Sequence, residues 1–425
     1  MSVTTVTVQP GVFLHILPTQ QFATTRILIN FTRQHDVASL GGRVLASNML
    51  ETASQKYPSQ TALARVLSDL YGASFGTDVL KTGALHTLRL RMTLVHDDFA
   101  TDSQSLLRDG FAFIREMMCN PLGDAEQGFD PTVFERQREI ALDEIAGLQE
   151  EKPFYAARQA INAYFTDPVQ AVPAYGTTKI LEKVSPKEAW DAWQDTMAHD
   201  RVDIIVLGDV DTATVEQAVA QLPLEPRAIA GNPYYEQDLF PAVKRTVELD
   251  KVNQARLILA YQLKLEQTDR FQGFVFNALF GGLAVSRLFM NVRETAGLAY
   301  SIYSDYNPYT GLLMVESGVD HAKLVEAEER IDAELTRLQT ELVGDDELNM
   351  IKGLMKADYV VSLDQPGRIT ERVQNQELIG YHTTPEEWLA AVDSVTAEQV
   401  QQVAQAVTKQ LHYELVGGKA SWLMH

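Results

Sequence analysis

Apolar and polar residues alternate along residues 85–95, which read LHTLRLRMTLV. The apolar positions are Leu88, Leu90, Met92 and Leu94, and the polar positions between them are Arg89, Arg91 and Thr93. Successive side chains of a strand point to opposite faces of a sheet, so a period of two predicts a strand. One face of this strand is expected to lie on a core and the other in water.

Helices are marked by their start signals and by apolar stripes. Ser185 is placed as an N-cap, Pro186 as the first helical residue and Glu188 as the residue that closes a capping box. Thr396 and Gln399 repeat the same box 211 positions after Ser185. A further amphipathic helix is predicted from the i, i+4, i+7 spacing of Ile331, Leu335 and Leu338.

The same order of elements occurs twice along the chain. The apolar strand cores RILIN at 26–30 and RLILA at 256–260 start 230 positions apart, and a helical pattern follows each. Between the two series, residues 223–245 contain four prolines and no helical period, which indicates an extended linker. We therefore expect an α+β fold with homologous halves at 1–222 and 246–425 that close like a clam-shell around a cavity.

Charge and composition exclude several classes of partner. The 36 basic and 57 acidic residues give a formal net charge of −21, which disfavours nucleic acid and anionic membrane surfaces. No apolar run reaches the roughly 18 residues of a membrane span, and the start, MSVTTVTVQP, has no signal-peptide pattern. A cytoplasmic location is expected.

Common catalytic and metal-binding patterns are missing from the sequence. The single cysteine, Cys119, excludes an internal disulfide, and its apolar neighbours in FIREMMCN predict that it is buried. The nine histidines show no H-x-x-x-H or H-x-x-H spacing. Nucleophile elbows, phosphate loops and dinucleotide-binding glycine patterns are absent as well.

The most specific local motif is SRLFMNVRETAGLAYSIYS at 286–304. With the preceding FGGLAVSRLF it resembles the C-terminal half of the pitrilysin/insulinase (M16) metallopeptidases, in which an Arg and a Tyr lie within R-E-x-x-G-L-A-Y-S. Arg293 and Tyr300 match these positions, and the resemblance implies that both bind the carbonyl group of a peptide substrate. A cation and a phenol can stabilise charge on that oxygen. The alternative is that Arg293 pairs with Glu294 on the surface and that Tyr300 caps a core.

The first half departs from the zinc motif of the same family. Active members carry H-x-x-E-H on a helix, and the resemblance of NMLETASQKYPSQ to the segment after that motif places its residues at Val44, Ser47 and Asn48. Two histidines at i and i+4 would share a helix face and bind one zinc ion, with the glutamate activating water. Valine, serine and asparagine do not provide these donors, so no metal site is expected. The third ligand of the family aligns with Glu144, but a lone glutamate at this position is better explained as a surface carboxylate or a helix pair partner than as a ligand.

The resemblance implies a non-catalytic M16-like subunit without a cofactor of its own. Its expected partners are a sister chain with an intact H-x-x-E-H helix, which would hold the zinc, and a peptide or protein substrate. A homodimer of the isolated chain remains open. The resemblance extends to a bacterial subset associated with modification of elongation factor P. The alternatives are a peptide-binding scaffold without proteolysis and an active zinc metallopeptidase whose ligands lie in another register.

Overall fold

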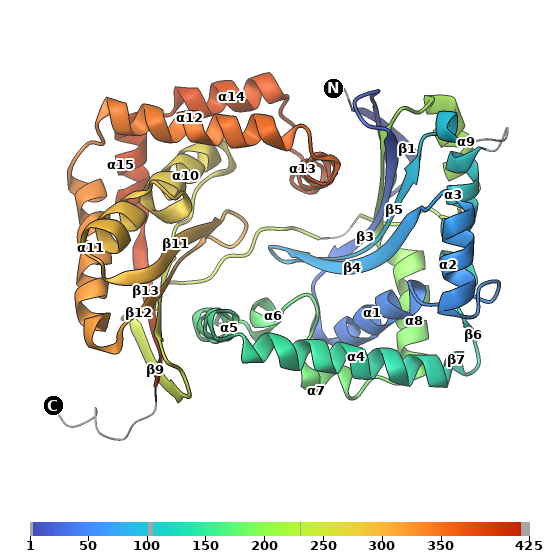
Figure 1. The fold of residues 1–425 in the computed structure, drawn as a ribbon, viewed down its shortest axis with the longest axis horizontal. Helices are drawn as coiled ribbons and strands as arrows, with labels where there is room; N and C mark the ends of the chain where they lie inside the picture. Colours follow the sequence, from blue (N-terminus) through green and yellow to red (C-terminus); the bar gives the residue numbers. More distant parts are fainter. Residues whose placement is uncertain (1–2, 101–104, 230, 418–425) are drawn as a thin grey trace. The chain divides into compact units, whose positions relative to one another are not determined.

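The computed structural model describes residues 3–100, 105–229 and 231–417, which form two compact units (Figure 1). The first unit contains residues 1–145, 172–233 and 362–381, and the second contains 146–171, 234–361 and 382–425. Each unit combines one antiparallel-rich sheet with helices. The predicted α+β class is therefore confirmed.

The sheet of the first unit has the strand order β1-β2-β8-β3-β5-β4. Neighbouring strands are antiparallel except β2 and β8, which are parallel. The strands are β1 (Thr4–Gln9), β2 (Val12–Pro18), β3 (Thr24–Gln34), β4 (Ser74–Thr82), β5 (Leu85–Val95) and β8 (Arg201–Gly208). A separate two-stranded sheet pairs β6 (Gly123–Asp124) with β7 (Gly128–Phe129).

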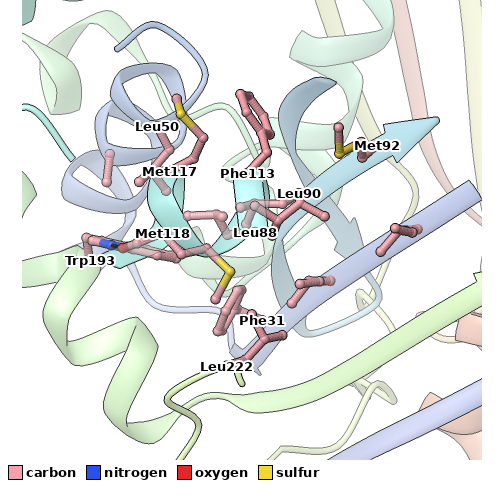
Figure 2. Close-up of a cluster of buried hydrophobic side chains, with 14 of the residues drawn as sticks. Phe31, Leu50, Leu88, Leu90, Met92, Phe113, Met117, Met118, Trp193 and Leu222 are labelled. Carbon is pink, nitrogen blue, oxygen red and sulfur yellow. Dashed lines mark hydrogen bonds between the residues drawn. The ribbon is translucent and has the colours of Figure 1, made fainter. Parts of the chain in front are cut away.

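Helices cover one face of this sheet and form the larger core. They are α1 (Val37–Leu50), α2 (Gln60–Asp69), α3 (Leu106–Cys119), α4 (Pro131–Glu150), α7 (Thr178–Leu181), α8 (Pro186–His199) and α9 (Thr212–Val219). Trp193 of α8 is fully buried, donates its indole N–H to the carbonyl of Met118 at 2.9 Å and meets Phe31 edge-on (Figure 2). The core thus joins β3, α3 and α8.

The two faces of strand β5 were predicted to be buried and solvated, and only the buried face agrees with the structure. Leu88, Leu90, Met92 and Leu94 all lie in the main core, as expected. The opposite face was expected in water, but the Arg89 side chain there is only 7% exposed. It donates two hydrogen bonds to Asp78, and Glu371 of α13 (Pro366–Ile379) lies 3.9 Å away. That face is therefore partly covered, because a helix from late in the sequence packs on this sheet.

The second unit contains a sheet in the order β11-β12-β10-β13-β9, in which only β13 and β9 are parallel. Its strands are β9 (Lys244–Asp250), β10 (Ala255–Gln262), β11 (Ala299–Asn307), β12 (Leu312–Val319) and β13 (Thr408–Gly417). Its helices are α5 (Lys152–Tyr164), α6 (Pro168–Ala171), α10 (Arg270–Asn277), α11 (Leu324–Thr340), α12 (Asp345–Ser362), α14 (Pro385–Ser394) and α15 (Ala397–Ala406). Two π-helical segments, η3 (Ala278–Gly282) and η4 (Leu288–Thr295), precede β11.

Each unit takes one helical segment from the other half of the sequence. Ala156 and Ala160 of α5 pack on β10, β12 and β13, which places α5 in the second unit. Ile369 and Val373 of α13 pack on Leu28 and neighbouring apolar residues of the first sheet. The compact units therefore differ from the contiguous halves 1–222 and 246–425 in these two segments.

Most local predictions for helices are confirmed. The capping boxes at Ser185 and Thr396 are both formed, and the apolar stripe of α11 is buried. Residues 223–243 contain no helix or strand among the described positions, and β9 begins at Lys244. Among the described residues no helix has the length and apolar character needed to cross a membrane.

The predicted burial of Cys119 is wrong. Cys119 is the last residue of α3 and is exposed to solvent. The buried residues of that helix include Phe113, Met117 and Met118, which occupy its other side. The apolar neighbours of Cys119 in the sequence therefore do not determine whether this last residue lies on the buried or the exposed side of α3.

An ion-pair network joins β13 and α11 in the second unit. Nε2 of the buried His412 lies 2.6 Å from Oε1 of Glu414, and Nδ1 lies 3.0 Å from Oε1 of Glu328. Burial alone would lower the pKa of His412, but the two carboxylates outweigh it and raise that pKa. Burial likewise opposes the ionised form of Glu328, yet hydrogen bonds from Lys409 and His412 lower its pKa from 4.5 to about 2.

The Glu328→Gln variant is expected to lose stability in a pH-dependent way. The folded pKa of Glu328 is depressed, so its contribution is complete above 4.5 and is lost as the pH falls toward about 2. The folded pKa of His412 is raised, so its contribution is complete below 6.5 and is lost as the pH rises through the raised value. The denaturant midpoints of the wild-type chain and of Glu328→Gln, measured across this pH range, give the difference in stability. That difference should be largest at pH values between the titration of Glu328 and the titration of His412.

Glu329 offers a matched control, because it is the next residue of α11 and is exposed. Glu329→Gln is expected to leave the denaturation midpoint nearly unchanged at every pH. A constant difference between the wild-type chain and Glu328→Gln across the whole pH range would contradict the role given to this network.

Candidate functional site

Helix α1 holds all three positions that align with the zinc motif. Asp36 caps the helix by accepting a hydrogen bond from the Ser39 amide at 3.0 Å. Val44 and Ser47 are 5% and 2% exposed, and Asn48 is half-buried. The Ser47 hydroxyl has no hydrogen-bond partner in the described part of the chain. The positions that align with the zinc motif are thus largely core positions.

The residues of α1 do not fit a zinc ion. Valine has no donor atom, and a serine hydroxyl is a poor base at neutral pH. Glu144 lies exposed on α4, where it is a surface carboxylate. Within the described ranges no group of three His, Cys, Asp or Glu side chains is placed to hold a metal ion. The motif positions of α1 therefore cannot support zinc chemistry.

Arg43, which is not among the predicted site residues, precedes these positions and is almost fully buried in α1. Its guanidinium donates to Asp200 Oδ2 at 2.6 Å, to Thr196 Oγ1 at 2.8 Å and to the Phe31 carbonyl at 3.1 Å. The signal that could have found it is a single charge inside the apolar run GGRVLASNML. This arginine ties α1 to α8 and to the sheet.

His86 completes the contacts of Arg43. Burial, and then the charge of Arg43, lower the pKa of His86 well below its usual value. A neutral His86 can accept from Nε of Arg43 through Nδ1 at 3.1 Å, while Nε2 donates to the Ala174 carbonyl at 3.0 Å. The polar groups around α1 therefore stabilise the fold of the first unit.

Arg293 and Tyr300 stand at the two ends of the connection from η4 to β11. Gly297 turns the chain with φ of 60°, and its amide donates to the Arg293 carbonyl at 3.1 Å. The Arg293 guanidinium lies 4.6 Å from the ring centre of Phe289, and its Nε is 3.6 Å from Glu294 Oε1. The Arg293 side chain remains 39% exposed.

Tyr300 is 61% exposed, so it does not cap a core. Its hydroxyl donates a hydrogen bond to Asp320 Oδ1 at 3.0 Å, and this bond raises the pKa of the phenol. Tyr300 therefore keeps its proton at neutral pH. The alternative reading of Arg293 as a partner of Glu294 agrees with the observed 3.6 Å approach, but it leaves the guanidinium accessible.

Strand β11 is one edge of the second sheet. Tyr303 is exposed on this strand and pairs across the sheet with Glu316 of β12. Tyr303 is only partly exposed, so partial burial, followed by a hydrogen bond with Glu316, raises its pKa, and burial raises the pKa of Glu316. An edge strand with exposed aromatic side chains has features that bind an extended peptide.

Comparisons of the sequence with known proteins find inactive relatives of metallopeptidases. The family model described as "Peptidase M16 inactive domain" matches residues 183–355. The chain is 24% identical over 414 residues to the "Probable inactive metalloprotease YmfF" of Bacillus subtilis, and the match covers 96% of each chain. Since the family model begins after α4, it does not include α1.

Solved structures share the fold over nearly the whole chain. A conserved protein from Enterococcus faecalis V583 is 31% identical, with a TM-score of 0.93 over 98% of this chain and 99% of that one. The structure of a peptidase M16 inactive domain from Pseudomonas fluorescens is 17% identical, with a TM-score of 0.81 over 99% of each chain. The latter match supports the fold alone.

Proposed function

The chain belongs to the M16 peptidase family as a non-catalytic homologue, and we propose that it is a peptide-binding subunit for a sister chain that retains the zinc helix. One contrast carries this proposal. The α1 positions of the zinc motif hold no metal donor set, whereas Arg293 and Tyr300 keep exposed polar groups beside the sheet edge β11. Such a chain can bind a peptide but needs another source of hydrolytic chemistry.

The proposed binding mode uses the backbone of β11 and the two side chains next to it. An extended peptide would add to this edge as a further strand, which gives affinity through main-chain hydrogen bonds. Arg293 would bind a peptide carbonyl as a fixed cation, and Tyr300 would donate through its phenol. When the sister subunit is present, its zinc would supply the polarising charge and the activated water.

The partner and the location follow from the same proposal. The sister chain is expected to carry H-x-x-E-H, to complete a shared chamber with this chain and to work with it in the cytoplasm. The association with elongation factor P modification stays a prediction. It would be supported by co-purification of that modification machinery with the pair.

Metal content gives the first test. The purified chain is expected to contain far less than one equivalent of zinc and to cleave no peptide by itself, because α1 lacks the donors. Elemental analysis and a peptide-cleavage assay with and without chelator measure this. Zinc near one equivalent together with chelator-sensitive cleavage would instead support the active-metallopeptidase reading.

A peptide-binding scaffold is the second candidate. The hydrogen bond from Tyr300 to Asp320 favours it, because the phenol is already engaged and would need to change partner to bind substrate. Mixing with the H-x-x-E-H relative separates the two readings. Chelator-sensitive activity of the mixture supports the subunit role, whereas a stable complex without activity supports the scaffold.

A further inference from the structure

The sheets of the two units differ at one edge. In the first unit β2 pairs in parallel with β8, and β1 covers the other side of β2 as an antiparallel strand. In the second unit β9 pairs in parallel with β13 in the same way. Among the described residues no strand covers the other side of β9, so this sheet ends one strand earlier.

The open edge also exposes apolar side chains. Val247 and Leu249 of β9 are 58% and 59% exposed, whereas Leu14 and Ile16 of β2 are fully buried. Unpaired backbone groups beside exposed apolar residues make a surface to which another strand can be added. The edge of β9 thus has the features that accept another strand, and its sequence indicates which strand fits.

The sequence of β9, KRTVELD, is complementary to itself when two copies run antiparallel about Val247. Lys244 of one copy then faces Asp250 of the other, and Thr246 faces Glu248. Cross-strand pairs of opposite charge stabilise a sheet, while like charges in that position destabilise it. The basic start and acidic end of this strand therefore favour an antiparallel copy of itself.

The two faces of the strand fit the same pairing. Lys244 and Asp250 lie on the face covered by α5, where Lys244 Nζ donates to the Ala163 carbonyl at 3.0 Å and Asp250 binds Lys152. Val247 and Leu249 lie on the opposite face. In an antiparallel pair Val247 would meet its own copy at the two-fold axis, with Leu249 near Arg245 of the other chain. Apolar area on both chains would then be removed from water.

We propose that two copies of this chain associate through β9, which would join their second-unit sheets into one continuous sheet. The contact is isologous, because each chain contributes the same strand and each pairing occurs twice. This inference does not depend on the proposed subunit function, since it requires neither a zinc-bearing sister nor a peptide.

Sedimentation of the purified full-length chain tests the proposal. We expect the wild-type chain at the mass of two chains and Val247→Lys at the mass of one, because two like charges would then oppose each other at the axis. Val325→Lys is the matched control, since Val325 is an exposed valine of α11 in the same unit. That variant should remain at the two-chain mass.

A mixing experiment separates this contact from general destabilisation. Val247→Glu alone is also expected at the one-chain mass, while an equal mixture of Val247→Lys and Val247→Glu should regain the two-chain mass. Only a contact in which position 247 faces itself predicts this recovery. The proposal is overturned if the wild-type chain stays at the one-chain mass, if Val247→Lys stays at the two-chain mass, or if the mixture does not recover.

Discussion

Asp200→Ala is expected to lower the free energy of unfolding by about 3–5 kcal/mol, because it leaves the buried charge of Arg43 without its partner. Both side chains are almost completely buried, and Arg43 Nη1 lies 2.6 Å from Asp200 Oδ2. Asp200 also has a second basic neighbour, because Nε of Arg33 lies 3.5 Å from Asp200 Oδ1. Denaturant unfolding of the purified variant measures the loss.

Asp195→Ala is the matched control for this prediction. Asp195 lies on α8 near Asp200 and pairs with Arg33, but it is 43% exposed. Loss of such a surface pair is expected to change stability by at most about 1 kcal/mol. If Asp195→Ala and Asp200→Ala destabilise equally, burial is not what makes the Arg43 contact strong.

A double substitution separates the loss of the Arg43–Asp200 attraction from the cost of leaving the buried charge of Arg43 unpaired. Arg43→Met with Asp200→Ala leaves no unpaired buried charge, so it is expected to be more stable than Asp200→Ala alone. Full recovery is not expected, since Arg43 also binds Thr196 and the Phe31 carbonyl. A double variant that is less stable than either single variant would contradict this account.

Arg293→Ala is expected to reduce the activity of the complex with the zinc-bearing sister by about 100-fold. That is the order of effect seen when one donor to a developing oxyanion is removed. Arg293 has an accessible guanidinium stacked on Phe289, so its loss removes a positioned cation without opening the core. The measurement is kcat/KM of the mixed complex for a peptide substrate, with the zinc content held equal.

Arg330→Ala provides the matched control, because Arg330 is an exposed arginine of α11 in the same unit. It removes the same charge from the chain and is expected to leave kcat/KM unchanged. Arg293→Lys should recover only part of the activity, since an ammonium group lacks the planar donor set of a guanidinium. Equal losses from Arg293→Ala and Arg330→Ala would show that only net charge matters.

The missing zinc chemistry could be recognised from the sequence alone. Donor atoms belong to residue types, so the letters alone predict that Val44, Ser47 and Asn48, which align with the zinc motif, lack its donor set. The motif around Arg293 and Tyr300 could likewise be found by its match to the family's sequence pattern. The structure added that both side chains are exposed and that Tyr300 binds Asp320, which depends on how η4 enters β11.

The sequence also determined the local elements, because capping, alternation and helical periodicity act over a few residues. The boxes at Ser185 and Thr396 and the buried alternation of β5 follow from such rules. The partner of Arg43 could not be read in this way, since Asp200 lies 157 positions away.

Only the tertiary structure decided which sheet each amphipathic helix covers. The apolar stripe of α5, which includes Ala156 and Ala160, predicts that one side of this helix is buried. The apolar stripe of α13 predicts the same for that helix. Hydrophobic burial has no direction and does not name a partner, so either sheet satisfies the pattern. In the folded chain α5 packs on the second sheet and α13 packs on the first. Because α13 lies on the first sheet, it partly covers the face of β5 on which Arg89 was expected to be in water.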